Sequence, residues 1–162
     1  MKSHHALKTR IDTPLGPMTA TRTAKGLSGL WFEGQKHYPD LADVPSGSDP
    51  LFVKLAAGLD RYFHGGELPD LPLDPQGTAF QQDVWKALLA IDAGRVDSYG
   101  AMAKRIGRPQ AVRALGAAVG RNPISILIPC HRVLGATGGL TGYAGGIERK
   151  QALLDLEKHE AA

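Results

Sequence analysis

The chain has 162 residues, of which 43% are hydrophobic and 22% charged, a composition typical of a folded globular protein rather than a disordered one. No apolar run approaches the roughly 20 residues that a membrane-spanning helix needs, and the first residues lack the apolar stretch of a secretory signal. Cys130 is the single cysteine, which excludes an internal disulfide and a multi-cysteine zinc site. We therefore expect a cytoplasmic protein with no metal, no other cofactor and no membrane partner.

Positive charge is concentrated in one part of the sequence. The formal net charge of the whole chain is +3. Residues 95–132 carry seven lysines and arginines against one acidic residue, Asp97, which gives this segment a net charge of +6. A positive region of this size is typical of proteins that bind a phosphate backbone. An ordinary solvated surface is the alternative interpretation.

The first half predicts short strands and one helix. Strands are predicted over residues 6–11, 18–23 and 27–32, with glycine- and proline-containing turns between them. The apolar residues of segment 52–63 recur every three or four positions, which predicts an amphipathic helix ending before Gly65. We assign residues 1–75 to an N-terminal α/β structural domain, because no chemically reactive group of residues lies there.

The second half, residues 76–162, predicts a more helical domain. Thr78 and Gln81 have the spacing of a capping box at the start of a helix. A second helix is predicted from a Ser98 cap to about residue 106, and a third over residues 110–120. Two short helices joined by a glycine-containing turn form a helix-turn-helix, a motif that binds DNA.

The third predicted helix has a face with very small side chains. Val112, Leu115 and Val119 are expected to point inward. The neighbouring face carries one long cation beside small residues, namely Arg113, Gly116, Ala117 and Gly120. Such a face lets a helix lie close against DNA while the arginine reaches further in. A tight helix–helix contact inside the protein is the alternative, and the spacing alone leaves both open.

Cys130 follows an apolar segment. Residues 124–128 are apolar and rich in β-branched side chains, which predicts a buried strand that ends at Pro129. An ordinary thiol has a pKa of about 8.5, so only a few per cent is thiolate at neutral pH. His131 and Arg132 are the nearest groups in sequence that could lower this pKa. A buried, inert cysteine is the alternative interpretation.

Residues 126–133 read Ile-Leu-Ile-Pro-Cys-His-Arg-Val, with Asn-Pro at 122–123 and Gly-Tyr-Ala-Gly-Gly at 142–146. This pattern closely resembles the O6-alkylguanine-DNA alkyltransferases, also called methylated-DNA–protein-cysteine methyltransferases. The resemblance is dense over residues 77–158 and looser before them. It implies a small ribonuclease H-like N-terminal α/β domain packed on a mainly helical C-terminal winged helix-turn-helix domain.

The resemblance also implies a role for individual residues. Cys130 matches the acceptor of the alkyl group, and His131 matches the histidine that acts on the thiol through a bound water. Glu157 falls where the family has the glutamate that orients this histidine. Asn122 matches the asparagine that braces the active-site segment, and Tyr99 the tyrosine that helps the leaving guanine become neutral.

The matched DNA contacts and base pocket follow in the same way. Arg113 corresponds to the arginine that enters the duplex, and its helix is expected in the minor groove. The other expected DNA contacts are Tyr99, Ala114, Gly116, Ala117, Gly120, Arg121 and Arg132. The expected pocket residues are Pro129, Tyr143, Ala144, Gly145 and Gly146. Some relatives carry serine at the position of Ala144, so one potential hydrogen bond to the substrate is absent.

The implied activity is DNA repair by direct damage reversal. The protein would flip O6-alkylguanine out of duplex DNA, transfer the methyl or larger alkyl group to Cys130, and act once as a monomer. Activity on O4-alkylthymine and cooperative binding along DNA stay open. A non-catalytic helix-turn-helix lesion sensor or regulator is one alternative. A cysteine hydrolase that uses Cys130 and His131 on a small substrate is the other, and the basic segment argues against it.

Overall fold

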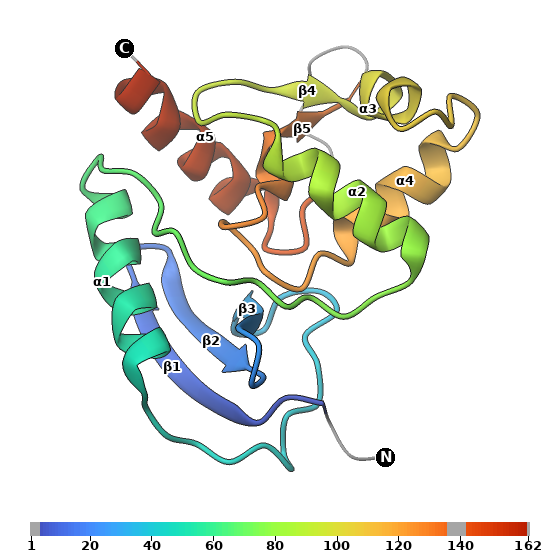
Figure 1. Cartoon of the computed structure of the whole chain (residues 1–162). Coiled ribbons are helices and arrows are strands. Elements are labelled where there is room, and N and C mark those ends of the chain that lie inside the picture. The colour runs from blue at the N-terminus through green and yellow to red at the C-terminus, as the bar shows by residue number, and fades with distance from the viewer. Residues whose placement is uncertain (1–3, 136–141, 162) are drawn as a thin grey trace. The chain divides into compact units, whose positions relative to one another are not determined.

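A computed structural model of the chain describes residues 4–135 and 142–161 (Figure 1). The chain forms two compact units. The first consists of Met1–Gln76 with Pro123–Leu127, and the second of Gly77–Asn122 with Ile128–Ala162. A short internal segment therefore belongs to the same unit as the N-terminal half of the chain.

The first unit contains a three-stranded antiparallel sheet in the order β1-β2-β3. The strands are β1 (Leu7–Thr13), β2 (Gly16–Arg22) and β3 (Leu27–Phe32). The tight turn between the first two strands has Gly16 at φ 115°, a backbone conformation that glycine adopts without a steric penalty. All six residues of β3 are buried, so this strand is the centre of the unit's core. The three predicted strands are confirmed, with ends shifted by at most two residues.

Helix α1 (Pro50–Phe63) packs against β1 in the same unit. The side chain of Asp49 caps its first turn by accepting a hydrogen bond from the Phe52 N–H, at 3.1 Å. Phe52, Leu55 and Leu59 are buried, which confirms the amphipathic helix that their spacing predicts.

The segment before Cys130 is not a strand. The Leu30 N–H donates to the carbonyl of Pro123 at 2.8 Å, and the Ser125 N–H donates to the carbonyl of Leu30 at 2.9 Å. Ile124 forms one isolated bridge to Leu30, and Ile126 then turns with φ 73°. A β-branched residue in this left-handed region cannot continue an extended strand. The strand predicted over residues 124–128 is therefore wrong, although the segment is buried.

The second unit is mainly helical. Its helices are α2 (Ala79–Leu89), α3 (Tyr99–Arg105), α4 (Val112–Gly120), the short 3-10 helix η1 (Cys130–Arg132) and α5 (Ile147–Ala161). The strands β4 (Asp97–Ser98) and β5 (Val133–Leu134) form a short parallel pair. The predicted capping box of Thr78 and Gln81 and the predicted Ser98 cap are both present. The indole N–H of Trp85 donates to the Ala118 carbonyl at 2.9 Å and joins α2 to α4.

Helices α3 and α4 form the helix-turn-helix. Gly107, with φ 77°, lies in the turn between them. Helix α4 begins at Val112, two residues later than predicted, and Val112 is exposed rather than inward-pointing. Leu115 and Val119 are buried as expected. A sheet-containing N-terminal unit and a mainly helical unit with a helix-turn-helix agree with the expected α/β fold class. Among the described residues, none of the helices could cross a lipid bilayer.

Candidate active site

Cys130 begins a single turn of 3-10 helix in the second unit. Its side chain is a free thiol, the residue is 6% exposed, and its N–H donates to the carbonyl of Ile128 at 2.8 Å. Pro129 precedes the turn and is also buried. The thiol therefore lies in a compact turn beneath the surface, not at the end of a strand.

Asn122 holds this turn from one side. Its side-chain N–H donates to the Ile128 carbonyl at 2.7 Å, and the residue is 4% exposed. A second hydrogen bond joins the side chain of Asn122 to the Cys130 thiol. One amide thus fixes both the backbone before the cysteine and the sulfur itself, a geometry suited to bracing the active-site segment.

Glu157 on α5 binds two neighbours of the cysteine at once (Figure 1 shows α5 in red). Its Oε2 lies 2.8 Å from Nε2 of His131. Arg132 donates to both carboxylate oxygens, from Nε to Oε1 and from Nη2 to Oε2, each at 2.8 Å. A bidentate arginine keeps a carboxylate ionised in a buried site. An ionised Glu157 accepts the Nε2–H of His131, so it fixes the histidine tautomer.

The structure contradicts the expectation that Arg132 contacts DNA. The residue is 5% exposed, and its third donor group, Nη1, donates to the Ile91 carbonyl at 2.5 Å. A guanidinium committed to Glu157 and a backbone carbonyl is not available to a phosphate. A count of charges along the sequence does not separate surface cations from buried ones.

His131 is neutral, and its second ring nitrogen, Nδ1, can accept a proton within the site. Burial lowers the pKa of His131, while the hydrogen bond and charge of Glu157 act in the opposite direction. With the proton on Nε2, Nδ1 carries a lone pair. This nitrogen is buried and has no hydrogen-bond partner among the residues that the structure describes. A buried, neutral acceptor of this kind can take a proton from a nearby acid.

Burial also determines the protonation state of the Cys130 thiol. It raises the pKa of Cys130 to about 11, although the hydrogen bond from Asn122 and the positive charge of Lys150 act to lower it. The resting thiol is therefore protonated at neutral pH. A base must remove its proton before the sulfur can act as a nucleophile.

Lys150 is a site residue that the sequence analysis missed. It is 0% exposed, and its ammonium donates to the Val133 carbonyl at 2.6 Å. Burial lowers the pKa of Lys150. Lysine is among the residues most rarely buried, so the amino-acid composition does not predict that Lys150 is buried. Lys150 and Glu157 are seven residues apart, a spacing that places them on the same face of a helix. This spacing is the sequence feature that could have indicated that Lys150 belongs to the site.

The expected DNA contacts of α4 lie at the surface. Arg113, Ala114, Ala117 and Arg121 are exposed, and Gly116 and Gly120 are half-buried. A Cβ atom added to Gly116 would meet the ring of Tyr99 at 3.9 Å, so Tyr99, the first residue of α3, lies beside this face. The exposure of these residues disfavours the alternative of an internal helix contact.

Four of the five expected pocket residues, residues 143–146, form the turn before α5, and Pro129 precedes η1. The Gly146 N–H donates to the Tyr143 carbonyl at 2.8 Å, and Gly146 has φ 97°, which favours glycine. Arg149 donates to the carbonyl of Gly145 at 3.2 Å. Tyr143 and Ala144 are half-buried. The turn is thus fixed by its own backbone and by the first residues of α5.

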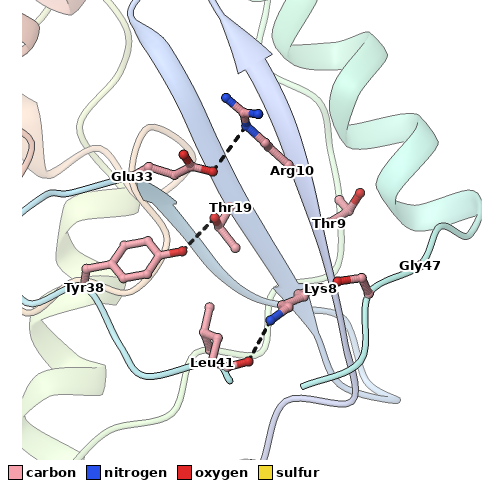
Figure 2. A pocket seen from close by; sticks show the side chains of 9 residues that line it. Lys8, Thr9, Arg10, Thr19, Glu33, Tyr38, Leu41 and Gly47 are labelled. Carbon is pink, nitrogen blue, oxygen red and sulfur yellow. Dashed lines mark hydrogen bonds and ion pairs between the residues drawn. The ribbon is translucent and has the colours of Figure 1, made fainter. Parts of the chain in front are cut away.

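A polar cavity of about 390 Å³ lies elsewhere, in the first unit (Figure 2). Lys8 donates to the Leu41 carbonyl at 2.8 Å, and Nε of Arg10 lies 3.3 Å from a carboxylate oxygen of Glu33. No cysteine or histidine is among its lining residues. Its charged side chains are thus engaged, Lys8 with a backbone carbonyl and Arg10 with Glu33, so we do not assign the function to this cavity.

Two family models match the chain. The model of the 6-O-methylguanine DNA methyltransferase ribonuclease-like domain matches residues 6–75. The model of the 6-O-methylguanine DNA methyltransferase DNA binding domain matches residues 79–159. The second match contains Cys130, His131 and Glu157.

Named relatives match most of the chain. The methylated-DNA–protein-cysteine methyltransferase of Mycobacterium tuberculosis is 49% identical over 154 residues, which cover 93% of this chain and 92% of the relative. The enzyme of the same name from Haemophilus influenzae is 43% identical over 152 residues, covering 93% and 85%.

A solved structure is also similar. The crystal structure of Mycobacterium tuberculosis OGT in complex with DNA superimposes with a TM-score of 0.88 at 45% identity, and covers 96% of this chain and 94% of that one. Since the two family models together match residues 6–75 and 79–159 and the relatives match 93% of the chain, the chain belongs to the 6-O-methylguanine DNA methyltransferase family.

Proposed function

We propose that the protein repairs DNA by moving a methyl or larger alkyl group from O6 of guanine in duplex DNA to its own Cys130. The observation that carries the proposal is the buried thiol beside a neutral histidine whose tautomer is fixed by Glu157. The names of the relatives and the DNA-bound structure of the mycobacterial protein support the same activity. Family membership favours this transferase over the sensor and hydrolase alternatives.

DNA binding is the first step of the proposal. Exposed cations, among them Lys104, Arg113 and Arg121, attract the phosphate backbone. The small residues of α4 let this helix lie in the minor groove, with Gly116, Ala117 and Gly120 facing the duplex. Arg113 enters the base stack and fills the space left when the damaged nucleotide turns outward, which costs a few kcal/mol.

The flipped base is received by a pocket lined by Pro129, Tyr143, Ala144, Gly145 and Gly146. Glycine permits a close approach of backbone to ligand. Ala144 offers no side-chain hydrogen bond to the base, so the O6 atom is recognised by other groups. Tyr99 lies next to the α4 face and is suited to donate a proton to the base as it leaves.

The chemical step follows from the His131–Glu157 pair. The proton of the Cys130 thiol passes to Nδ1 of His131, directly or through one water, and Glu157 stabilises the imidazolium that forms. The thiolate attacks the alkyl carbon, so a bond between sulfur and carbon forms as the bond from carbon to O6 breaks. The electron pair goes to guanine, which takes a proton from Tyr99. Asn122 keeps the sulfur in place throughout.

The product is a thioether, which has no easy hydrolysis route. Each molecule, acting as a monomer, therefore repairs one lesion and stops. We assign this chemistry and DNA binding to residues 76–162 and a structural role to residues 1–75. The hydrogen bonds from Leu30 to the segment before the cysteine support that role. A reducing, cytoplasmic compartment suits an acceptor that must remain a free thiol.

The mass of the intact protein after exposure to an O6-methylguanine oligonucleotide tests the proposal. We expect a gain of one methyl group per molecule, located on Cys130 by peptide mapping, and no gain in the Cys130→Ser variant. Release of methyl product over repeated cycles would instead support a hydrolase. Tight binding of the lesion with no gain of mass would support a sensor.

A further inference from the structure

Lys150 stands out among the lysines of the described chain because it alone is fully buried. It lies in the first turn of α5, and its ammonium donates to the Val133 carbonyl. Taking an ammonium group out of water is costly, and hydrogen bonds to neutral oxygen atoms compensate only part of the cost. A buried cation retained in such a place calls for a function that uses its charge.

The charge of Lys150 acts on the cysteine. Helix α5 packs on η1, and Val133 is three residues after Cys130, so the bond to its carbonyl keeps the ammonium beside the turn that carries the thiol. The interaction is reciprocal, because the cation lowers the pKa of Cys130 and a charged sulfur raises the pKa of Lys150. The low dielectric of a buried site strengthens this attraction.

The charged network next to Cys130 in the chain joins the same two elements, η1 and α5. On η1, Arg132 is bound to Glu157, and His131 donates to the same carboxylate. Asn122 contributes a neutral hydrogen bond. Proton transfer from Cys130 to His131 creates a thiolate and an imidazolium. Glu157 is bonded to the ring that becomes the imidazolium, and the positive charge of Lys150 acts on the thiolate.

We propose that Lys150 is a positioning residue whose ammonium stabilises the Cys130 thiolate formed when His131 takes the thiol proton. The inference deepens the proposed function, on which it rests. The proton leaves Sγ and arrives on Nδ1 of His131, so no outside reactant is needed. After alkyl transfer the sulfur is neutral, and the attraction to Lys150 disappears.

Iodoacetamide tests the inference without DNA. Cys130 is the only cysteine, so each modification reports on this sulfur. Replacing Lys150 by methionine (Lys150→Met) keeps the length of the side chain and removes its charge. We expect the modification rate of this variant to fall about tenfold or more between pH 7 and 9, since a rise of one unit in the thiol pKa lowers the thiolate fraction tenfold.

Two controls separate the charge from the fold. Lys150→Arg keeps the charge and is expected to react within about threefold of the wild type. Lys158→Met removes an exposed lysine of the same helix and should leave the rate unchanged. Urea-unfolded samples of all variants should react equally. If Lys150→Met does not fold, Lys150→Ala with added ethylammonium replaces it, and a rate that rises with the amine in this variant alone supports the inference.

A Lys150→Met protein that is folded and reacts as fast as the wild type would overturn the inference, as would an absence of rescue by ethylammonium. The methyl-transfer rate from DNA should fall by the same factor as the iodoacetamide rate, with oligonucleotide affinity unchanged. The experiment distinguishes a failure of the proposed repair activity from a failure of the proposed role of Lys150. If the wild type takes no methyl from DNA but the iodoacetamide rates still differ, the repair activity is wrong and the role of Lys150 stands.

Discussion

Glu157 is the residue on which the buried network depends, because Arg132 and His131 both donate to it. Removing one partner of a buried ion pair costs about 3–5 kcal/mol, since it leaves the other charge buried without compensation. We therefore expect Arg132→Met to lower the free energy of unfolding by about this amount, as measured by urea denaturation.

Arg113→Ala is the matched control for this substitution. Arg113 is exposed on α4, and its removal should change stability by less than about 0.5 kcal/mol. Equal losses from the two substitutions would contradict the structural role of Arg132. The pair of variants also separates the arginine that holds the site from the one proposed to enter DNA.

The histidine pKa values predict a pH dependence of stability. Burial lowers the pKa of His131, and it lowers the pKa of His5 to about 4. Below pH 6.5 the unfolded chain binds protons at these positions that the folded chain does not. The stability they contribute is complete above pH 6.5 and decreases as the pH falls toward the folded pKa values.

Urea denaturation between pH 7.5 and pH 4.5, a range chosen around the ordinary histidine pKa of about 6.5, measures this effect. We expect His131→Gln and His5→Gln each to flatten the decrease. His64→Gln, at an exposed position, serves as the control. An unchanged slope in both variants would show that other groups control the acid sensitivity.

Among the elements, α4 combines stability and recognition in one surface. Alanine is favoured over glycine in a helix by about 1 kcal/mol, and a Cβ at Gly116 would make ordinary contact with Tyr99. Gly116→Ala should therefore raise the melting temperature. A larger side chain, in Gly116→Leu, should keep the fold but weaken binding to duplex DNA at least tenfold, because it holds the helix away from the groove.

Fluorescence anisotropy with a labelled duplex measures the binding of both variants. Asp83→Leu, at an exposed position of α2, places an equal side chain away from the proposed interface and should leave affinity within about twofold. Full affinity of Gly116→Leu would show that DNA does not lie on this face.

The sequence predicted those elements whose signals are local. Thr78 with Gln81 and Ser98 cap helices through bonds to residues three positions away, so spacing is enough to find them. The strand predicted over residues 124–128 is wrong because β-branched side chains favour strands, whereas this segment forms an isolated bridge to Leu30 and its backbone reverses at Ile126. Leu30 is almost a hundred residues distant along the chain.

The candidate active site shows the same limit of sequence-based prediction. Its residue types could be read from the resemblance, but the burial of Arg132 and Lys150 depends on α5 packing against η1. Both are cations, and cations are exposed in most proteins. Tertiary packing determines which of the cations remain at the surface, and this packing cannot be predicted from a single sequence.

At the scale of the whole molecule, charge predicts how DNA affinity responds to salt. Arg95, Lys104, Arg113 and Arg121 are exposed, whereas Arg132 is buried. The logarithm of affinity for undamaged duplex should fall linearly with the logarithm of salt concentration. Arg121→Ala should reduce the slope by about 1, the contribution of one phosphate contact.

Lys36→Ala is the control for this measurement, because Lys36 is an exposed cation of the first unit and lies outside the basic segment. Its slope should equal that of the wild type. Equal slopes for all three proteins would show that Arg121 makes no phosphate contact.

The depth of Cys130 has a consequence for a protein that works once. A cysteine that is 6% exposed, with a thiol pKa of about 11, reacts poorly with peroxide, glutathione disulfide and other electrophiles, all of which require thiolate. A molecule can therefore wait a long time between synthesis and use without being spent on the wrong reaction. The number of lesions a cell can reverse is then set by how many copies it stores.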